Sequence, residues 1–263
     1  MMEQQGNFTA NFQAGLGVVP ETKLLLGLYE PGLSIPQLRQ RALDSGLFPK
    51  LSARRLRNLV GECFAPRYMV ENGLPARCLK ILLPSFESRE LLQVLMLHTA
   101  RSQEIFTSFI RTVYWARYAD GQLSLGNEDA QQFIQRALDD GRMQSSWTEN
   151  TIRRVSSYLT GASADFGLLE GGQKRSRKIL PVHILPRTVV YLAYDLHLRG
   201  LGDNAVLSHP DWGLFGLGRD ETLDELKRVS RDGHFIVQAA GEAVRISWKY
   251  SSLEEVCHGI AGR

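Results

Sequence analysis

The sequence predicts a mainly α-helical protein with short β-hairpins, in which helix-turn-helix or winged-helix-like modules surround a central helical bundle. Apolar residues recur at helical spacing through most of the 263 residues, and serine or threonine caps precede several of these stretches. Only two stretches show the alternation and turn residues of β-hairpins. We expect an N-terminal helix-turn-helix-like module at 1–85, a central helical section at 86–145 and a C-terminal winged-helix-like region, with a terminal hairpin and helix, at 146–263.

The N-terminal module begins with about 20 polar, glycine-rich residues that we expect to pack loosely. The short helix "ETKLLLGLYE" follows and ends at a Pro-Gly pair. Ser34 and Gln37 have the spacing of a capping box, which predicts a helix that starts there and stops at Gly46. Ser52 is the expected cap of the next helix. Two helices joined by a glycine-containing turn are typical of a helix-turn-helix module.

The helix after Ser52 is amphipathic, with an apolar face and a basic face. Over residues 54–64, one side of the helical wheel is apolar, and the other carries Arg54, Arg55 and Arg57. These arginines are candidate nucleic-acid contacts, or else an ordinary solvated helix face. Gly61 on the polar side predicts the close approach of another backbone, from protein or nucleic acid, since glycine weakens a helix interior.

The central section is helical over residues 86–120 and again over 127–140. Its aromatic residues recur at helical spacing, so we expect core packing in preference to base stacking. These residues are Phe106, Phe109, Tyr114, Trp115 and Tyr118. The remaining tryptophans, Trp147, Trp212 and Trp248, are expected to be packing residues as well.

Thr148 is the expected cap of a helix that closes at Gly161. The apolar stripe of this helix is predicted to face the core, which leaves Arg153 and Arg154 on the exposed side. Because a basic hairpin follows, the two arginines would lie on the helix that a winged-helix module inserts into a DNA groove.

The stretch "EGGQKRSRKILPVHI" concentrates positive charge in a possible hairpin. Residues 168–169 and 179–182 are its predicted strands, and the paired glycines before the cations offer backbone N–H groups to phosphate. Like charges repel, so an ordered cluster of cations favours a nearby anion, although a mobile solvated loop is the alternative. The cations at the expected tip are Lys174, Arg175, Arg177 and Lys178.

The C-terminal part contains predicted helices at 186–199 and 220–231, followed by the hairpin "HFIVQAAGEAVRISWK". Gly241-Glu242 between its strands suits a type II′ turn. Ser252 and Glu255 have capping-box spacing, which predicts a last helix.

Composition and motifs narrow the class of function. The net charge is only +3 and the histidines are scattered, and neither a phosphate-binding loop nor a catalytic serine elbow is present. We therefore expect no catalytic residue, metal or cofactor. Three cysteines in apolar stretches, Cys63, Cys78 and Cys257, indicate buried reduced thiols and a cytoplasmic protein. The sequence shows no secretory signal, and its apolar runs are shorter than the ~20 residues that span a bilayer, so we expect no membrane contact.

Three stretches resemble the BrxA family, a small component of bacterial BREX phage-defence systems. They are "SWTENTIRRVSSYLTGASADFGLL", "LSHPDWGLFGL" and "GHFIVQAAGEAVRISWKYSSLEE". The resemblance implies a soluble, mainly helical, non-enzymatic protein that binds double-stranded DNA beside other phage-defence system proteins. It assigns no functional residue, so the candidate contacts above rest on charge and helix geometry.

The leading hypothesis is double-stranded DNA binding through phosphate contacts. If about six phosphates are neutralised, affinity falls on the order of 10³-fold between about 50 and 200 mM salt. The alternatives are a protein–protein assembly adaptor of the defence complex and an RNA-binding helical protein, since RNA also binds basic faces.

Overall fold

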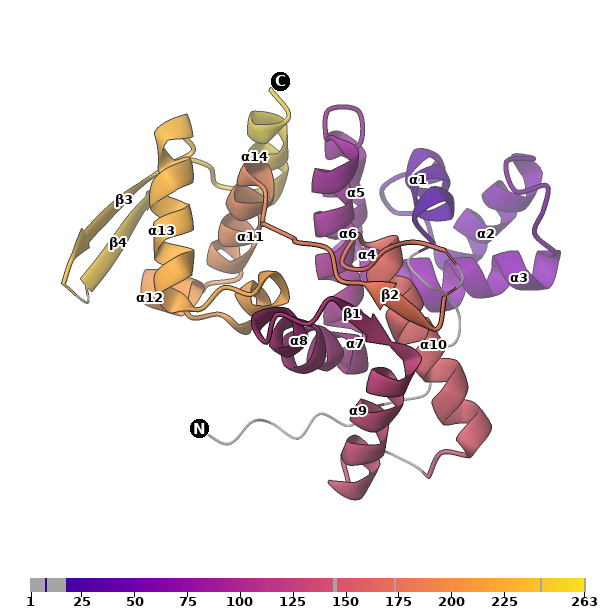
Figure 1. Ribbon diagram of the computed structural model, residues 1–263. Coiled ribbons are helices and arrows are strands. Elements are labelled where there is room, and N and C mark those ends of the chain that lie inside the picture. Colours follow the sequence, from indigo (N-terminus) through magenta and orange to yellow (C-terminus); the bar gives the residue numbers. More distant parts are fainter. Residues whose placement is uncertain (1–7, 9–17, 144–145, 173, 242, 263) are drawn as a thin grey trace. The chain divides into compact units, whose positions relative to one another are not determined.

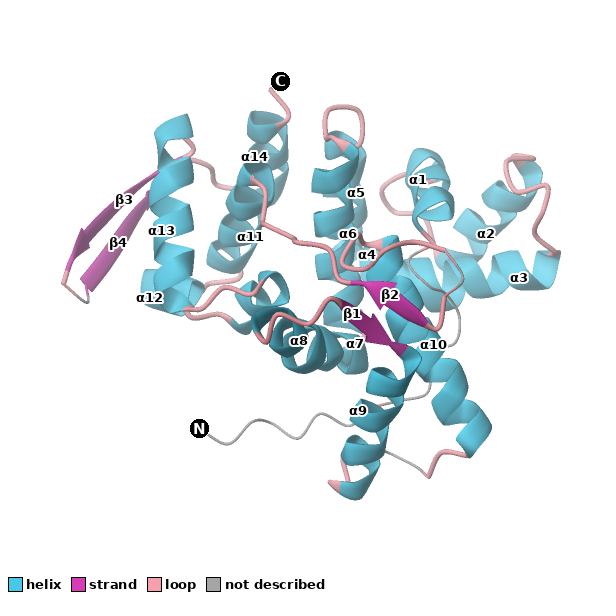
Figure 2. Cartoon of the chain, viewed as in Figure 1, coloured by secondary structure: helices cyan, strands magenta, loops and turns pink. Residues whose placement is uncertain are grey.

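The protein is mainly α-helical with two short antiparallel sheets, as the sequence predicts (Figure 1). The computed structural model describes Phe8 and residues 18–143, 146–172, 174–241 and 243–262. Helices dominate both compact units into which the chain divides (Figure 2). Unit 1 comprises residues 1–76 and 95–182, and unit 2 comprises 77–94 and 183–263. The three modules expected from the sequence stay a prediction.

The N-terminal helices of unit 1 begin and end where their capping residues predict. The Ser34 hydroxyl accepts from the Gln37 N–H at 3.4 Å, and the Gln37 side chain accepts from the Ser34 N–H at 2.9 Å. Gly46 has φ +67°, the left-handed conformation that ends a helix at low steric cost. The helices are α1 (Val19–Leu28), α2 (Ile35–Asp44), α3 (Ala53–Asn58), a π-helical turn (Leu59–Phe64) and α4 (Ala65–Tyr68).

The predicted apolar face of the third helix is buried, but one other expectation for this part of the chain is wrong. Leu56, Val60 and Phe64 are at most 2% exposed. A Cβ on Gly61 would meet no atom of the described residues within 4 Å, so the close approach of a backbone from another molecule stays a prediction. Phe8 is only 2% exposed because its ring packs on Phe133, so at least this residue of the N-terminal stretch is not loosely packed. The rest of that stretch, up to residue 17, lies outside the described residues.

Most of the predicted aromatic core of unit 1 is buried. Phe106, Phe109 and Tyr114 are fully buried, and the Tyr114 hydroxyl donates to the Leu180 carbonyl at 2.7 Å. Tyr118 stacks on Tyr114 but is 37% exposed. The elements in this region are α7 (Glu104–Phe109), a π-helical turn (Ile110–Tyr114), α8 (Trp115–Ala119), β1 (Ser124–Gly126), α9 (Asn127–Asp139), α10 (Glu149–Asp165) and β2 (Ser176–Lys178).

Helix α10 starts as predicted and ends later than predicted. The Thr148 hydroxyl accepts from the Thr151 N–H at 3.3 Å, which confirms the cap. The helix continues through Gly161 to Asp165, because Gly161 is an interior position on the buried face and not a left-handed stop. The sequence signal for a glycine stop was misleading here, since a small residue also suits tight helix packing.

Unit 2 contains a helical core and the better-formed hairpin. Strands β3 (Phe235–Ala240) and β4 (Ala243–Trp248) pair antiparallel, with Val237 opposite Ile246. Gly241 has φ +60°, which suits the first turn position, while Glu242 lies outside the described residues. The helices are α11 (Pro186–Leu198), α12 (Asp203–Leu207), a 3₁₀ helix (Pro210–Phe215), α13 (Arg219–Val229), a 3₁₀ turn (Ser230–Asp232) and α14 (Leu253–Ile260). Helices α5 (Leu74–Leu82) and α6 (Ser88–Ser102) each contribute residues to both units.

The last helix and the cysteines largely follow the sequence. The Ser252 hydroxyl accepts from the Glu255 N–H at 3.3 Å, but the Glu255 carboxylate accepts from the N–H and hydroxyl of Ser251. The three cysteines are free and buried, as expected.

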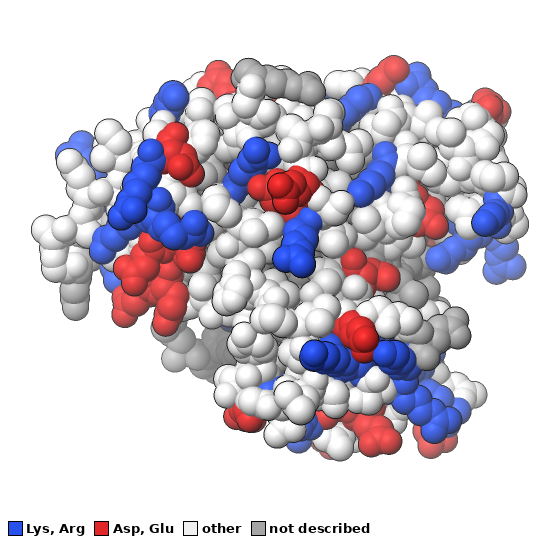
Figure 3. Space-filling view, turned by 45° about the horizontal axis from the view of Figure 1, so that its top comes forward, with Lys and Arg blue, Asp and Glu red and all other residues white. Residues whose placement is uncertain are grey.

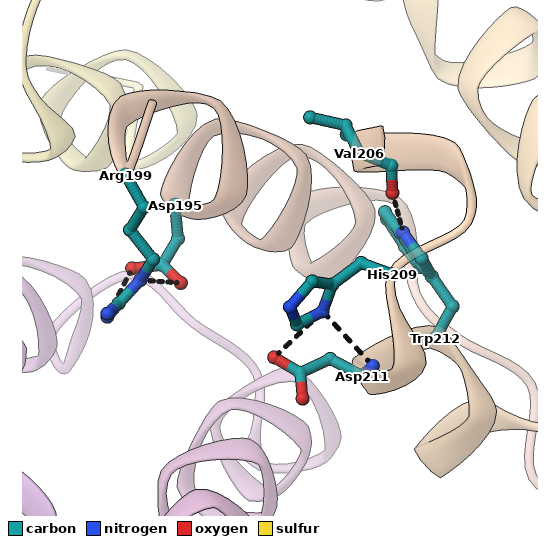
Figure 4. A network of polar contacts seen from close by, with 6 residues as sticks. All are labelled: Asp195, Arg199, Val206, His209, Asp211 and Trp212. Carbon is teal, nitrogen blue, oxygen red and sulfur yellow. Dashed lines mark hydrogen bonds and ion pairs between the residues drawn. The ribbon is translucent and has the colours of Figure 1, made fainter. Parts of the chain in front are cut away.

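The stretch "LSHPDWGLFGL" builds a rigid corner after α12 (Figure 4). The buried Trp212 indole donates to the Val206 carbonyl at 2.7 Å. His209 Nδ1 accepts from the Asp211 N–H at 3.2 Å, which caps the 3₁₀ helix. The Trp212 indole and the His209 ring thus bond to the backbone of the same stretch. They stabilise this corner of the fold.

Candidate nucleic-acid interface

Helix α10 presents two exposed arginines side by side near its first turn. Val155 and Leu159 anchor the helix in the core of unit 1, and Arg153 and Arg154 therefore face solvent. In the part of the chain that the structure describes, neither arginine has an ion-pair or hydrogen-bond partner. Their charges are therefore available to an external anion.

Behind α10 the chain forms a small three-segment β arrangement in place of a simple two-stranded hairpin. Residues 168–170 run antiparallel to 178–180, with a bridge from Leu169 to Ile179. On its other side, β2 pairs with β1, with Leu125 opposite Arg177. The predicted hairpin is thus present, but residues 176–178 belong to a strand, which moves the tip to 171–175.

The third segment, β1, is held close by a glycine. A Cβ at Gly126 would lie 2.8 Å from the Arg175 carbonyl oxygen, so any larger residue would push the strands apart. The Asn127 N–H donates to the same carbonyl at 2.9 Å, which joins the start of α9 to the strand beside the tip. The base of the cationic tip is therefore fixed by two elements that precede it in sequence.

The four predicted cations of the tip are not equivalent. Lys174 pairs with the Glu170 carboxylate at 2.7 Å, and this hydrogen bond holds the pKa of Glu170 below its usual range. Arg177 donates to the Glu170 carbonyl at 3.1 Å and so ties together the two arms of the hairpin. Arg175 and Lys178 are exposed and form no ion pair within the described residues, although the charge of Lys178 also helps to lower the pKa of Glu170, after the larger effect of Lys174. These two side chains are therefore the ones most accessible to an external anion.

The arginines of α3 form a second basic surface in unit 1. Ser52 caps α3 by accepting from the Arg55 N–H at 3.2 Å, and the first turn of the helix is exposed. Arg54 and Arg57 are exposed and have no ion-pair partner within the described part of the chain. Helix α3 packs against α2, whereas α10 packs against α9, so the two surfaces are built by different helix pairs.

Comparison with known protein families shows which family this chain belongs to. The sequence model of the BrxA family matches residues 6–195, which is more than half of the chain. The chain belongs to the BrxA family. This match confirms the family that the sequence motifs resemble. Membership of the BrxA family implies that the protein is a component of a BREX phage-defence system. Among curated proteins, none matches this sequence.

A solved structure supports the fold of this BrxA-family protein. An uncharacterised protein from Magnetospirillum magneticum superposes with a TM-score of 0.58 at 14% identity. The match covers 73% of the chain described here and 94% of the Magnetospirillum magneticum chain. At this identity the likeness concerns the fold alone.

Charge is mixed over the face drawn in Figure 3, where basic and acidic side chains alternate. Helix α13 of unit 2 shows this alternation locally, because Arg228 pairs with Glu225 and Lys227 lies 4.0 Å from Asp224. These cations are neutralised by their own helix, unlike Arg153 and Arg154. Among the described residues, the α10 surface shares this lack of neutralisation with Arg54 and Arg57 of α3.

Two further observations concern other classes of function. Across the described ranges, no three His, Cys, Asp or Glu side chains are grouped so that they could hold a metal ion. None of the helices in those ranges combines the length and the apolar character needed to cross a bilayer.

Proposed function

We propose that this BrxA-family protein is a non-enzymatic accessory protein of a BREX system that binds double-stranded DNA mainly through phosphate contacts. The observation that carries the proposal is the exposed, unneutralised pair Arg153 and Arg154 on a helix that leads directly into a basic hairpin. A duplex carries one negative charge per about 1.7 Å of axis, so a row of free cations is the feature that supports backbone binding.

The order of elements from α7 to β2 supports a winged-helix module. Three helical segments are followed by a hairpin, and β1, which lies between the first and second segments, pairs with the last strand. In a module of this kind the third helix, here α10, enters the major groove, and the hairpin tip contacts the neighbouring backbone. Arg153 and Arg154 would then contact phosphates at the groove edge.

The structure refines the role that each cation of the hairpin has in this proposal. Arg175 and Lys178 would contact phosphates directly. Lys174 shares its charge with Glu170 and would contribute only if it leaves that carboxylate. Arg177 is a positioning residue, since its guanidinium holds the hairpin arms together through the Glu170 carbonyl.

The α3 surface is proposed as an additional contact. Arg54, Arg55 and Arg57 project from the first turns of a capped helix, as in a helix-turn-helix module. Because α3 and α10 belong to different helix pairs, removal of the α3 charges should weaken binding independently of the α10 charges.

The experiment that tests the proposal is a fluorescence-anisotropy titration with a labelled random duplex over a series of salt concentrations. Binding that weakens steeply and equally for unrelated duplex sequences supports phosphate contacts. Competition with structured RNA tests the alternative that the protein binds RNA. If structured RNA displaces the labelled duplex at equal concentration, the protein has no preference for DNA. Affinity that does not change with salt contradicts the proposal.

Membership of a BREX system suggests protein partners from the same system. Co-purification from cells that express the whole BREX system tests the alternative that the protein is an assembly adaptor. A variant in which Arg153, Arg154, Arg175 and Lys178 are changed to glutamine should keep any direct protein partner. If DNA binding is lost while every partner is retained, the two activities use different surfaces.

A further inference from the structure

Two cysteines of unit 2 lie together in its core. Cys78 is on α5 and Cys257 is on α14, and neither side chain is exposed to solvent. Their thiols are in hydrogen-bond contact. A disulfide bond is about 2.05 Å long, so thiols already in contact need only a small movement of their side chains to form one. Cys78 and Cys257 are therefore placed to react with each other, whereas Cys63 is in unit 1.

A second contact joins the same two helices beside the thiols. The Arg77 Nε donates to the Glu254 carboxylate at 2.6 Å. Arg77 directly precedes Cys78, and Glu254 lies three residues before Cys257, which places both α14 residues on one side of that helix. The ion-paired side chains are 26% and 39% exposed, whereas the thiols are fully buried. The ion pair thus lies at the rim of the contact between α5 and α14, and the thiols lie beneath it.

In the closed arrangement the two thiols should react slowly. Burial raises the pKa of Cys257 well above its usual range, and the hydrogen-bonded Cys78 thiol raises it further. The charges of Glu254 and Asp195 add to this effect. Because the thiolate is the reactive form and a dissolved oxidant does not reach a fully buried sulfur, oxidation requires α14 to move away from α5.

We propose that Cys78 and Cys257 are a redox site, at which hydrogen peroxide converts the two thiols into a disulfide that links α5 to α14. In the open form one thiolate attacks a peroxide oxygen, the O–O bond breaks, and a sulfenic acid and hydroxide form. The hydroxide takes up the proton that the thiol had lost and becomes water. The second thiol then attacks the sulfenic sulfur, the S–S bond forms, and a second water leaves. Two thiols are oxidised and one peroxide is reduced.

The disulfide would hold α14 on α5 and prevent the opening that allowed it to form. It joins positions far apart in sequence, which restricts the unfolded chain and raises stability. A small-molecule thiol would reverse the reaction by exchange. The inference does not rest on the proposed DNA binding, because both cysteines are in unit 2 and the basic elements of the proposed DNA interface are in unit 1.

Peptide mapping after peroxide treatment tests the proposal directly. The protein is incubated with hydrogen peroxide, its remaining thiols are blocked with N-ethylmaleimide in denaturant, and it is digested with trypsin without reduction. Cys78 is then in the peptide "CLK", Cys257 in "YSSLEEVCHGIAGR" and Cys63 in "NLVGECFAPR". We expect the first two peptides to be joined by a bond that dithiothreitol cleaves, and the Cys63 peptide to carry the blocking group.

Three results of this mapping would overturn the proposal. They are thiols that stay reduced at both positions, oxidation of either sulfur to a sulfinic acid with no link to the other, and links to Cys63 that are as frequent as the link between Cys78 and Cys257. Each would show that the two thiols do not react with each other in preference to other partners.

Thermal unfolding measures the effect of the bond. The oxidised wild type should unfold at a temperature higher by roughly 5 °C or more, and dithiothreitol should remove the increase. Cys257→Ala should show no increase on oxidation, whereas the matched control Cys63→Ala, at another buried cysteine, should show the full increase. An increase that persists in Cys257→Ala contradicts the proposal. If Cys257→Ala is unfolded, the peptide map of the wild type decides alone.

The rate of oxidation tests the position of the ion pair over the thiols. Glu254→Gln breaks the pair with Arg77 and should speed disulfide formation about two- to fivefold, the factor expected for a partly exposed ion pair that holds the closed form. The control Glu225→Gln breaks the pair with Arg228 on α13 and should leave the rate unchanged. Equal rates in the two variants would contradict oxidation through the separation of α5 and α14.

Discussion

Replacement of Arg153 and Arg154 by glutamine should lower the salt dependence of duplex binding by a calculable amount. Four exposed cations of α10 and the hairpin form no ion pair among the described residues, namely Arg153, Arg154, Arg175 and Lys178. Each phosphate neutralised contributes about −0.9 to the slope of log K against log salt, so these four cations should contribute about −3.6 to the wild-type slope, to which the α3 arginines add their own share. Through these four contacts alone, a salt increase from about 50 to about 200 mM weakens binding about 150-fold.

The double variant removes two of these contacts and should have a slope about 1.8 less steep than that of the wild type, so its loss of affinity over the same salt range should be about 12-fold smaller. Fluorescence anisotropy with one labelled duplex measures both slopes. The matched control is Lys227→Gln with Arg228→Gln, which removes the same charge from an exposed helix face where both cations already have acidic neighbours. If the Arg153 and Arg154 variant retains the wild-type slope, or if the control loses as much, the assignment of α10 is refuted.

Three further predictions concern individual contacts. Glu170→Gln releases Lys174 and should steepen the slope of duplex binding by about 0.9, which the same titration measures, whereas an unchanged slope would show that Lys174 does not reach the duplex. Gly126→Ala should destabilise the protein by about 1–3 kcal/mol in urea denaturation, because the new methyl group meets a carbonyl oxygen of the next strand. Gly171→Ala, where a Cβ meets nothing, should change stability little, and equal losses would contradict the packing argument. Trp212→Phe should cost about 1–3 kcal/mol because the buried Val206 carbonyl loses its shortest hydrogen bond and keeps only longer backbone ones, and a variant of wild-type stability would show that this bond contributes nothing net.

The helices could be predicted because their signals are local. Ser34, Ser52 and Thr148 cap the helices that the sequence assigned to them, since the hydroxyl and the N–H that it accepts from are only three residues apart. The apolar faces of α3 and α10 followed from spacing within one or two turns. Such patterns are determined by the chain segment itself and need no knowledge of distant residues.

The arrangement of the hairpin could not be predicted, because it depends on residues far apart in sequence. Strand β1 pairs with β2 across about 50 residues, and no local pattern marks the three-residue stretch at Ser124 as its partner. Gly126 was the available signal, since a glycine directly before a helix is consistent with a close backbone approach.

The exposure of Arg153 and Arg154 could be predicted from the sequence, but the pairing of the hairpin cations could not. The sequence placed Lys174 and Arg177 with Arg175 and Lys178 as equal phosphate contacts. The structure shows that the carboxylate and carbonyl of Glu170 engage the first two. A neighbouring acid four residues away was visible in the sequence, but whether it pairs with a lysine depends on how the turn folds.

Site-specific photo-cross-linking measures the central claim most directly, because it reports contact without depending on affinity. A benzophenone amino acid at position 175, at the hairpin tip, should cross-link to a labelled duplex on irradiation. The same amino acid at position 228, on α13, should not, since that helix carries its own acidic partners. Cross-linking of the duplex at 228 and not at 175 would contradict the account.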